Sequence, residues 1–400
     1  MTVRRRHCRL GTIHLLLGLL AACAPQRTIE AINVLGDISA GDGVSRLKAT
    51  TPSPERRTIR SVSPGRTLGD LYWPGEHTEA ALVLVPGAVE DSRDDPRLIA
   101  FANTFARARF AVLVPEISGL NAQHVSAEHA EPIGRAIQAL TACTGTAEEP
   151  GSIGVAAISY AGGPTLLAAL HPVIGARIRF ALVIGGYFDT EAMITFATTG
   201  HFRSSPDVSW QYREPNAYGK WLFVQDNAQR LSDSADQTAL AEIAARKLEH
   251  PSADIADLRR DLGHDGRAVM ALLDNLDPDR VPSLIEALPS AIRTELEALD
   301  LKRRDLSRLP FELLLVHGRD DPIIPSTESE ALAAAAPDDR SSLYIVDSLA
   351  HVELGPAGLI DGLKLLRAVY RLLALRDALP APVKLACIER LQAETSASIK

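Results

Sequence analysis

The sequence predicts an α/β fold, in which helices flank a mostly parallel sheet and a large helical segment is inserted between two strands. Three observations lead to this prediction. Six unbroken apolar runs are each followed by a stretch with helical spacing, which is typical of parallel strands covered by helices. One long interval, residues 187–308, has helical spacing but no convincing strand. Ser159 stands at the point where one apolar run turns into a helical stretch.

Eight strands are expected. The first two, over 57–62 and 66–73, form a hairpin that turns at Ser63-Pro64-Gly65. The remaining six are apolar throughout, which indicates burial on both faces. They cover residues 81–85, 111–114, 153–158, 180–184, 313–316 and 343–346. Helices are expected between them, over residues 96–108, 128–143, 160–170 and 327–335.

The interval 187–308 is too long for a connecting loop and is interpreted as a helical cap. Prolines mark helix boundaries within it, and helices are expected over residues 218–231, 235–248, 253–262, 266–276 and 281–299. The interval also carries aromatic side chains that either line a pocket over Ser159 or pack the cap itself; these are Phe202, Trp210, Tyr212, Tyr218 and Trp221.

The first 22 residues have the character of an export signal. Four arginines precede the short apolar stretch 13–20, which is shorter than a membrane-spanning helix. The following Leu20-Ala21-Ala22-Cys23 resembles the lipobox of bacterial lipoprotein precursors. The resemblance implies cleavage before Cys23 and acylation of that cysteine, which would attach the protein to a membrane. The alternative is an ordinary secretory signal that happens to be followed by a cysteine.

In bacterial lipoproteins an aspartate after the acylated cysteine favours the inner membrane. Ala24 stands there, so the resemblance implies the periplasmic side of the outer membrane. Residues 23–57 are polar and rich in small residues, and we expect them to form a flexible tether. The core is expected over 58–186 and 309–376, and a helix or tail over 377–400.

Composition limits the possible partners. The formal net charge is −8, and removing the signal takes away four arginines and no acidic residue, which makes it −12. This charge gives no electrostatic footprint for nucleic acid. The histidines have no spacing typical of metal ligands. Cys143 and Cys387 would remain after processing, either as a disulfide or as two buried thiols. Oligomeric state is left open.

Ser159 is followed along the chain by a carboxylate and a histidine in strand-end contexts. The segment Ala157-Ile158-Ser159-Tyr160-Ala161-Gly162-Gly163 has the character of a nucleophile elbow. With the strands and cap, residues 58–374 resemble the α/β-hydrolase superfamily. In that family the acid motif has the form His-Gly-x-x-Asp-x-x-Val-Pro, which matches residues 317–325 and makes Asp321 the acid, with Asp320 as runner-up. The histidine after the last strand is His351.

The resemblance implies a serine hydrolase that cleaves a small-molecule ester without a cofactor. His351 would accept the proton of Ser159, and Asp321 would hold the imidazole tautomer. The backbone N–H groups of Tyr160 and Ala88 would form the oxyanion hole, with Val89 as second choice for the latter. His317 precedes Gly318 at a strand end and is interpreted as structural.

Two features depart from the family pattern. Alanines replace both glycines of the elbow, and Pro86 stands where a histidine is frequent. These departures favour one alternative to an esterase, a catalytically silent binding or envelope-assembly lipoprotein on the same fold. Within enzymes, a peptidase or an acyltransferase is the other alternative. Nothing in the sequence specifies the chemistry of the substrate.

Overall fold

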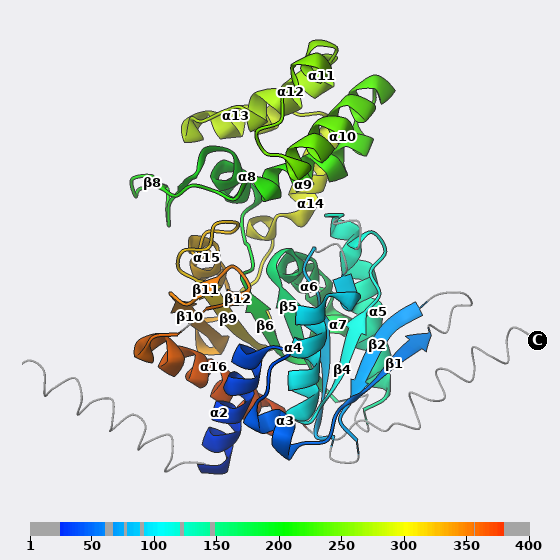
Figure 1. The fold of residues 1–400 in the computed structure, drawn as a ribbon, viewed down its shortest axis with the longest axis vertical. Coiled ribbons are helices and arrows are strands. Elements are labelled where there is room, and N and C mark those ends of the chain that lie inside the picture. The colour runs from blue at the N-terminus through cyan, green and yellow to red at the C-terminus, as the bar shows by residue number, and fades with distance from the viewer. Residues whose placement is uncertain are drawn as a thin grey trace, which may run out of the picture.

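A central eight-stranded sheet organises the protein (Figure 1). The structure is a computed structural model that describes residues 25–60, 67–75, 78–88, 92–120, 124–144, 149–355 and 357–379. The strand order in the sheet is β1-β2-β4-β3-β5-β6-β9-β10. The strands are β1 (Glu55–Arg60), β2 (Thr67–Trp73), β3 (Ala80–Val85), β4 (Phe110–Pro115), β5 (Ile153–Ile158), β6 (Ile178–Ile184), β9 (Glu312–Gly318) and β10 (Ser341–Val346).

The strand directions agree with the prediction of a mostly parallel sheet. From β4 to β10 every neighbouring pair is parallel, whereas β2 pairs antiparallel with both β1 and β4. The antiparallel pairing of β1 with β2 agrees with the expected hairpin, although its expected turn at 63–65 lies outside the described residues. This is the α/β-hydrolase architecture that the sequence resemblance implies.

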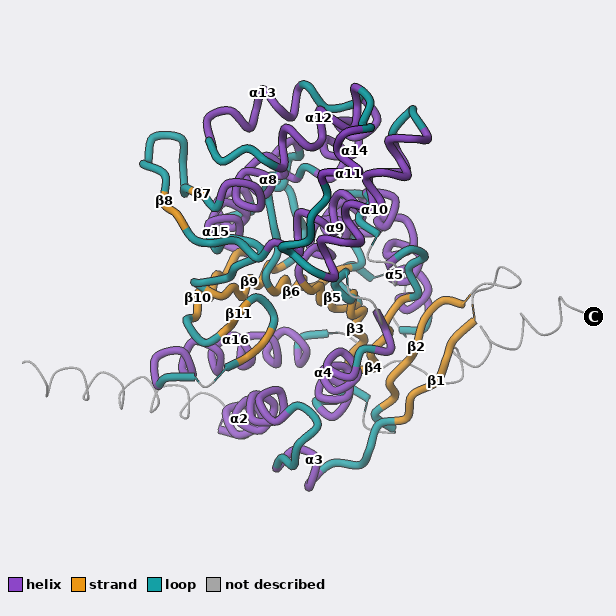
Figure 2. Tube along the Cα trace, turned by 45° about the horizontal axis from the view of Figure 1, so that its top comes forward, coloured by secondary structure: helices purple, strands orange, loops and turns teal. Residues whose placement is uncertain are grey.

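Helices cover both faces of the sheet because its central strands are apolar on both sides. One hydrophobic cluster joins the sheet to α5 (Ala130–Ala142), α6 (Gly162–Ala169), α7 (Pro172–Gly175) and α15 (Thr327–Ala335). A second joins the opposite face to α2 (Pro25–Ala40), α4 (Pro96–Arg107) and α16 (Leu359–Asp377), as Figure 2 shows. In β3, Val83 belongs to the first cluster, and its neighbours Leu82 and Leu84 to the second.

The chain between β6 and β9 forms a helical insertion with its own hydrophobic cluster. Two details differ from expectation. The expected helix over 281–299 is broken at Pro289, which lacks the N–H that a helix interior requires, and the two-residue strands β7 and β8 occur where no strand is expected. The insertion consists of α8 (Thr190–Thr199), β7 (His201–Phe202), β8 (Gln211–Tyr212), α9 (Ala217–Asn227), α10 (Ser234–Glu249), α11 (Ala256–Arg260), α12 (His264–Leu273), α13 (Val281–Glu286) and α14 (Ser290–Leu299).

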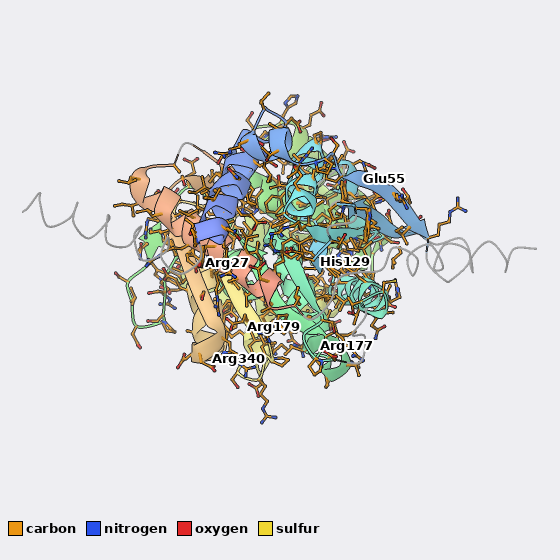
Figure 3. All side chains as sticks on the ribbon, turned by 90° about the horizontal axis from the view of Figure 1, so that it is seen from below. Arg27, Glu55, His129, Arg177, Arg179 and Arg340 are labelled. Atoms are coloured by element: carbon orange, nitrogen blue, oxygen red, sulfur yellow. The ribbon has the colours of Figure 1, made fainter. Side chains whose placement is uncertain are left out.

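The prediction of a flexible tether over 23–57 is wrong for its described part. Residues 25–40 form α2, and α3 (Arg46–Thr50) follows. Ala31 and Val34 of α2 are fully buried, because apolar residues recur three and four positions apart and face α4 and α16. Figure 3 shows Arg27 beside α16, where it forms an ion pair with Asp377. The abundance of small and polar residues therefore hid an amphipathic helix.

Several predictions fall on residues that the structure does not describe. Residues 1–24, with the expected signal and Cys23, lie outside the described part, as do residues 380–400 with Cys387. Cys143 is disulfide-bonded, and the other three cysteines of the sequence are all outside the described residues. Within the described ranges, no helix combines the length and apolar character that crossing a membrane requires.

Candidate active site

Ser159 occupies a sharp turn between β5 and α6. Its φ of +56° lies in the left-handed region, which a residue with a side chain adopts at a cost of about 1–3 kcal/mol. The strand ends at Ile158, a short 3₁₀ turn covers Ser159–Ala161, and α6 begins at Gly162. Such strained backbone is concentrated at functional sites, where it aims a side chain. Here it places the serine at the carboxyl edge of the sheet.

The space that this turn requires is provided by Gly162 and Gly163. A Cβ atom on Gly162 would lie 2.8 Å from Val183 Cγ1, and one on Gly163 would lie 2.1 Å from the hydroxyl oxygen of Tyr187. The alanines on either side of the serine, Ala157 and Ala161, are buried in the first hydrophobic cluster. The substitution of the usual glycines by alanine is therefore compatible with the turn, because the crowded positions are the two that follow.

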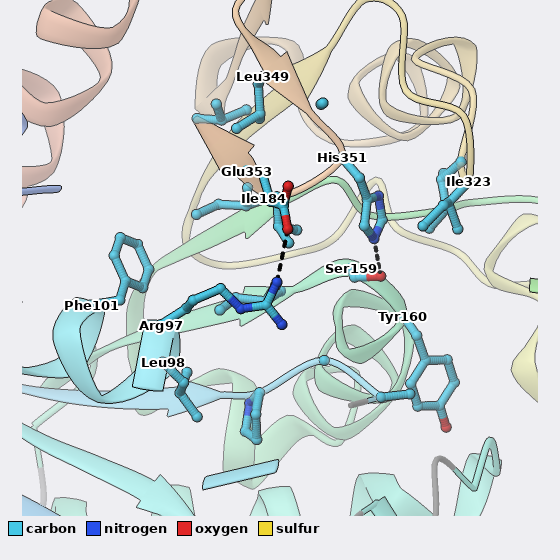
Figure 4. Close-up of a pocket in the computed structure, with 18 of the residues that line it drawn as sticks. Arg97, Leu98, Phe101, Ser159, Tyr160, Ile184, Ile323, Leu349, His351 and Glu353 are labelled. Carbon is cyan, nitrogen blue, oxygen red and sulfur yellow. Dashed lines mark hydrogen bonds and ion pairs between the residues drawn. The ribbon is translucent and has the colours of Figure 1, made fainter. Parts of the chain in front are cut away.

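Ser159, His351 and Asp321 form a continuous row of hydrogen bonds. Nε2 of His351 is 2.7 Å from the hydroxyl oxygen of Ser159 (Figure 4), and Nδ1 is 2.7 Å from Oδ2 of Asp321. The three side chains come from the ends of β5, β9 and β10, which is why residues so far apart in sequence meet. With the Nδ1–H donating to the carboxylate, Nε2 is left to accept the serine proton.

Asp321 is fully buried and held on both oxygens. Oδ1 accepts hydrogen bonds from the backbone N–H groups of Ile323 and Ile324, at 2.8 and 3.0 Å. Burial alone would raise the pKa of the Asp321 carboxyl, but hydrogen bonds from His317 and His351 outweigh burial and hold that pKa well below its usual range. The carboxyl is therefore ionised at neutral pH.

The runner-up acid and the neighbouring histidine have different surroundings. The side chain of Asp320 is 72% exposed and forms an ion pair with Arg213 at 2.8 Å. His317 is fully buried, with Nε2 3.3 Å from Oδ2 of Asp321 and Nδ1 2.6 Å from the hydroxyl of Ser329. Nε2 also lies 2.9 Å from the carbonyl oxygen of Ile324. The interpretation of His317 as structural stays a prediction, and its contact with Asp321 places the ring directly behind the carboxylate.

His351 sits at the tip of a small hairpin formed by β11 (Leu349–Ala350) and β12 (Glu353–Leu354). Its φ is +56°, the same left-handed region as that of Ser159. The hairpin comes very close to the end of β9, since a Cβ on Gly318 would lie 1.9 Å from the carbonyl oxygen of Leu349. Gly318 therefore lets the histidine hairpin approach the strand that carries the acid.

The loop after β3 runs beside the serine turn. A Cβ on Gly87 would lie 3.5 Å from the Cβ of Ser159, so this loop passes within van der Waals distance of the serine. Ala88 follows in this loop and lines the same cavity as Ser159 and Tyr160. Val89, the second choice for the oxyanion hole, lies outside the described residues.

The side chain of Tyr160 links the serine turn to residues 126 and 127, and these residues are in turn held by the insertion. Its hydroxyl donates to the carbonyl of Ser126 and accepts from the N–H of the same residue, both at 2.7 Å. Beside it, Glu295 from α14 accepts a hydrogen bond from the N–H of Ala127 and forms an ion pair with Arg230 at 3.0 Å. Burial raises the pKa of the Tyr160 hydroxyl, so this phenol is neutral and acts as a hydrogen-bonding link.

Glu328 anchors the start of the insertion. Oε2 of this fully buried carboxyl accepts hydrogen bonds from the N–H groups of Phe188 and Asp189, at 2.9 and 2.8 Å. Lys302, near the end of the insertion, in turn pairs with Asp189 at 2.6 Å. Burial raises the pKa of Glu328 to about 7. No sequence pattern indicated this residue, because its role depends on burial against a distant loop.

Ser159 and His351 open into a cavity of about 970 Å³. The insertion contributes mostly aliphatic side chains to its wall, from α8, α9, α12 and α14. The aromatic residues considered from the sequence have other surroundings. Phe202 and Trp221 are buried, Trp210 donates to Asp279, and Tyr212 is exposed. The side chain of Tyr218 lies outside the described part.

Comparison with known proteins gives only distant likenesses. No protein-family model matches the sequence, and no curated protein does so significantly. Among solved structures, a serine hydrolase from Cycloclasticus zankles is 16% identical, with a TM-score of 0.42 over 80% of this chain and 96% of that one. The rice cell wall degrading esterase LipA from Xanthomonas oryzae is 13% identical, with a TM-score of 0.46 over 84% and 94%.

A third solved structure, a putative hydrolase from Legionella pneumophila, is 12% identical, with a TM-score of 0.44 over 83% of this chain and 92% of that one. All three TM-scores are below 0.5, so the fold assignment depends on the sheet itself. The strand order and directions, together with a serine turn after β5, give the chain the α/β-hydrolase fold.

Proposed function

We propose that the protein is a serine hydrolase that cleaves a carboxylic ester through an acyl-enzyme on Ser159. The observation that carries this proposal is the unbroken row from Ser159 to His351 to buried Asp321, with both hydrogen bonds at 2.7 Å. A serine hydroxyl is a poor nucleophile at neutral pH unless a neighbouring base accepts its proton. The strained turn at Ser159 supports the same role, since it aims the hydroxyl at that base.

The reaction follows from these positions. Ser159 Oγ attacks the ester carbonyl while its proton passes to Nε2 of His351, and Asp321 stabilises the resulting imidazolium. The negative charge on the carbonyl oxygen is held by the N–H groups of Tyr160 and Ala88. His351 then gives the proton to the departing alcohol. Water attacks the acyl-enzyme with His351 again as base, which releases the acid and restores the serine.

Steady-state hydrolysis tests the proposal. We expect p-nitrophenyl butyrate to be hydrolysed and the matching p-nitroanilide to be hydrolysed far more slowly. Ser159→Ala should abolish the ester activity, and Ser348→Ala, which removes a serine hydroxyl away from the row, should retain it. Rapid quench with a radiolabelled acyl group should trap label on the wild-type protein alone. Ester hydrolysis that persists in Ser159→Ala would contradict the proposal.

We further propose that Cys23 is acylated and attaches the protein to the periplasmic side of the outer membrane. Since α2 begins at Pro25, two residues beyond Cys23, an acyl group there would hold the folded body within about 7 Å of its point of attachment. Labelling cells with an alkyne fatty acid tests this. Wild type should carry the label and sediment with outer membranes, whereas Cys23→Ser should lose both properties.

A further inference from the structure

Two sets of helices line the cavity at Ser159, and the part of the cavity beside each set is here called an arm. One lies beneath the insertion and is lined by residues of α8, α9, α12 and α14. The other, here called the lateral arm, lies between the sheet and helices α2, α4 and α16. Figure 4 shows Leu98 and Phe101 on α4 and Ile184 at the end of β6, which line the same pocket as Ser159 and His351. The lateral arm therefore belongs to the same cavity as the candidate nucleophile.

The lateral arm reaches the face of the sheet. Leu182 of β6 and Val316 of β9 line the cavity and retain exposures of 6% and 7%. Their neighbours in the same strands, Val183 and Leu315, face the opposite helices and have no exposure. In a parallel sheet that helices cover on both faces, the side chains of the central strands are normally fully buried. The residual exposure of Leu182 and Val316, both of which line the cavity, indicates space beside these two side chains that packing does not fill.

The helices that form the lateral arm present aliphatic and aromatic side chains at helical spacing. On α16 the lining residues recur at intervals of three and four positions, which places them on one face; they are Leu365, Ala368, Val369 and Leu372. At a rise of about 1.5 Å per residue, the seven steps from Leu365 to Leu372 span ~10 Å. An extended chain advances ~1.2 Å per bond, so this length corresponds to roughly eight chain atoms.

The buried carboxylate of Asp37, at the α2 side of the lateral arm, already has polar partners within the protein. Asp37, which is 1% exposed, accepts a hydrogen bond from Thr104 at 2.7 Å and pairs with Lys48 at 3.2 Å. The hydroxyl of Ser45 donates to its other oxygen. A ligand in the arm therefore does not have to supply a polar partner for this carboxylate. What the wall offers a ligand is apolar contact.

At the active-site end, Arg97 of α4 and Glu353 of β12 form an ion pair at 2.9 Å (Figure 4). Their side chains are 63% and 69% exposed, so water screens this pair and little free energy opposes its separation. The pair joins α4 to the hairpin that carries His351. A chain can thus enter between these two elements without breaking a buried interaction.

We propose that the ester substrate carries an unbranched apolar chain of about eight carbons and that this chain lies in the lateral arm. This inference rests on the proposed esterase function and names the substrate class for the same site. Burial of each methylene should raise kcat/KM by up to about fourfold, the factor that corresponds to about 0.8 kcal/mol. The increase should stop once the chain fills the arm.

Two series of esters test this with the purified full-length protein. One is p-nitrophenyl esters with acyl chains of two to twelve carbons, and the other is acetates of alcohols of the same lengths. In whichever series places its chain in the lateral arm, kcat/KM should rise steeply up to about eight carbons and then stay constant. Ala368→Phe, which fills the lateral arm, should reduce at least tenfold the ratio of kcat/KM for the eight-carbon substrate to kcat/KM for the two-carbon substrate. Ala197→Phe, the same change in the arm beneath the insertion, should leave the ratio intact.

The outcomes separate this inference from the esterase proposal. If hydrolysis occurs but neither series depends on chain length, or if Ala197→Phe alone removes the dependence, the lateral arm is not the chain site. If Ala368→Phe does not fold, the smaller Ala368→Val must still reduce the ratio. Calorimetric binding of the two-carbon and octyl esters to Ser159→Ala needs no catalysis. It should show the same preference for the longer chain, and its absence would overturn the inference.

Discussion

Replacing Asp321 by asparagine probes the row of hydrogen bonds most selectively. Oδ1 of the carboxylate accepts two backbone N–H groups, and the amide oxygen of asparagine can keep both. The amide NH₂ then faces Nδ1 of His351, which is 2.7 Å from the present Oδ2. Two donors cannot share this contact, so the imidazole must carry its proton on Nε2. In that tautomer it cannot accept the proton of Ser159.

The expected loss in kcat/KM is about 10³–10⁴-fold, or roughly 4–5.5 kcal/mol, as for the same change in other triads. Initial rates with p-nitrophenyl butyrate measure it, and circular dichroism checks that the variant is folded. Asp320→Asn is the matched control, because it changes the adjacent carboxyl, which pairs with Arg213 at the surface. It should stay within about twofold of wild type. Comparable losses in both variants, or a loss in Asp320→Asn alone, would refute the assignment.

Three further predictions concern the structure around the site. The pKa of Glu328 is raised from 4.5 to about 7 in the folded state, so between these pH values the folded protein binds a proton that the unfolded chain releases. The free energy of unfolding should therefore fall as pH rises through this interval. Chemical denaturation of Glu328→Gln at several pH values should show a smaller dependence of the free energy of unfolding on pH. Gly163→Ala should lower the free energy of unfolding by about 1–3 kcal/mol, measured as a lower denaturation midpoint, because its Cβ would overlap Tyr187. Val34→Ala should lower the free energy of unfolding by about 1–3 kcal/mol, because Val34 is fully buried. Ile32→Ala, at a 52% exposed position of α2, should change it by less than about 0.5 kcal/mol. Equal thermal midpoints for these two variants would mean that α2 is not part of the folded body.

The sheet was predictable because burial on both faces leaves a clear trace in sequence. Runs such as 153–158 and 180–184 contain no charged residue to obscure their boundaries. The candidate triad followed from the same source, since Ser159 stands directly after such a run, and Asp321 and His351 each lie five residues beyond the end of one. In a parallel sheet the carboxyl ends of strands share one edge, so order and context were enough to bring them together.

Other features depend on contacts that no short pattern records. Helix α2 was hidden because its apolar residues, including Val34, are interspersed with small and polar ones, and its packing partners lie at α4 and α16. The raised pKa of Glu328 requires complete burial against Phe188 and Asp189, which are about 140 residues away. The contact of His317 with Asp321 depends on how the loop after β9 folds back. Each of these is a property of tertiary packing.

Labelling with a fluorophosphonate tests the central claim most directly, since this reagent phosphonylates a serine only where a base has activated it. The purified protein would be treated with the fluorophosphonate, its mass measured by intact mass spectrometry, and the modified residue located by peptide mapping. We expect a single adduct on Ser159 that is absent in His351→Ala and strongly reduced in Asp321→Asn. No adduct on folded wild-type protein, or an adduct that His351→Ala retains, would contradict the account.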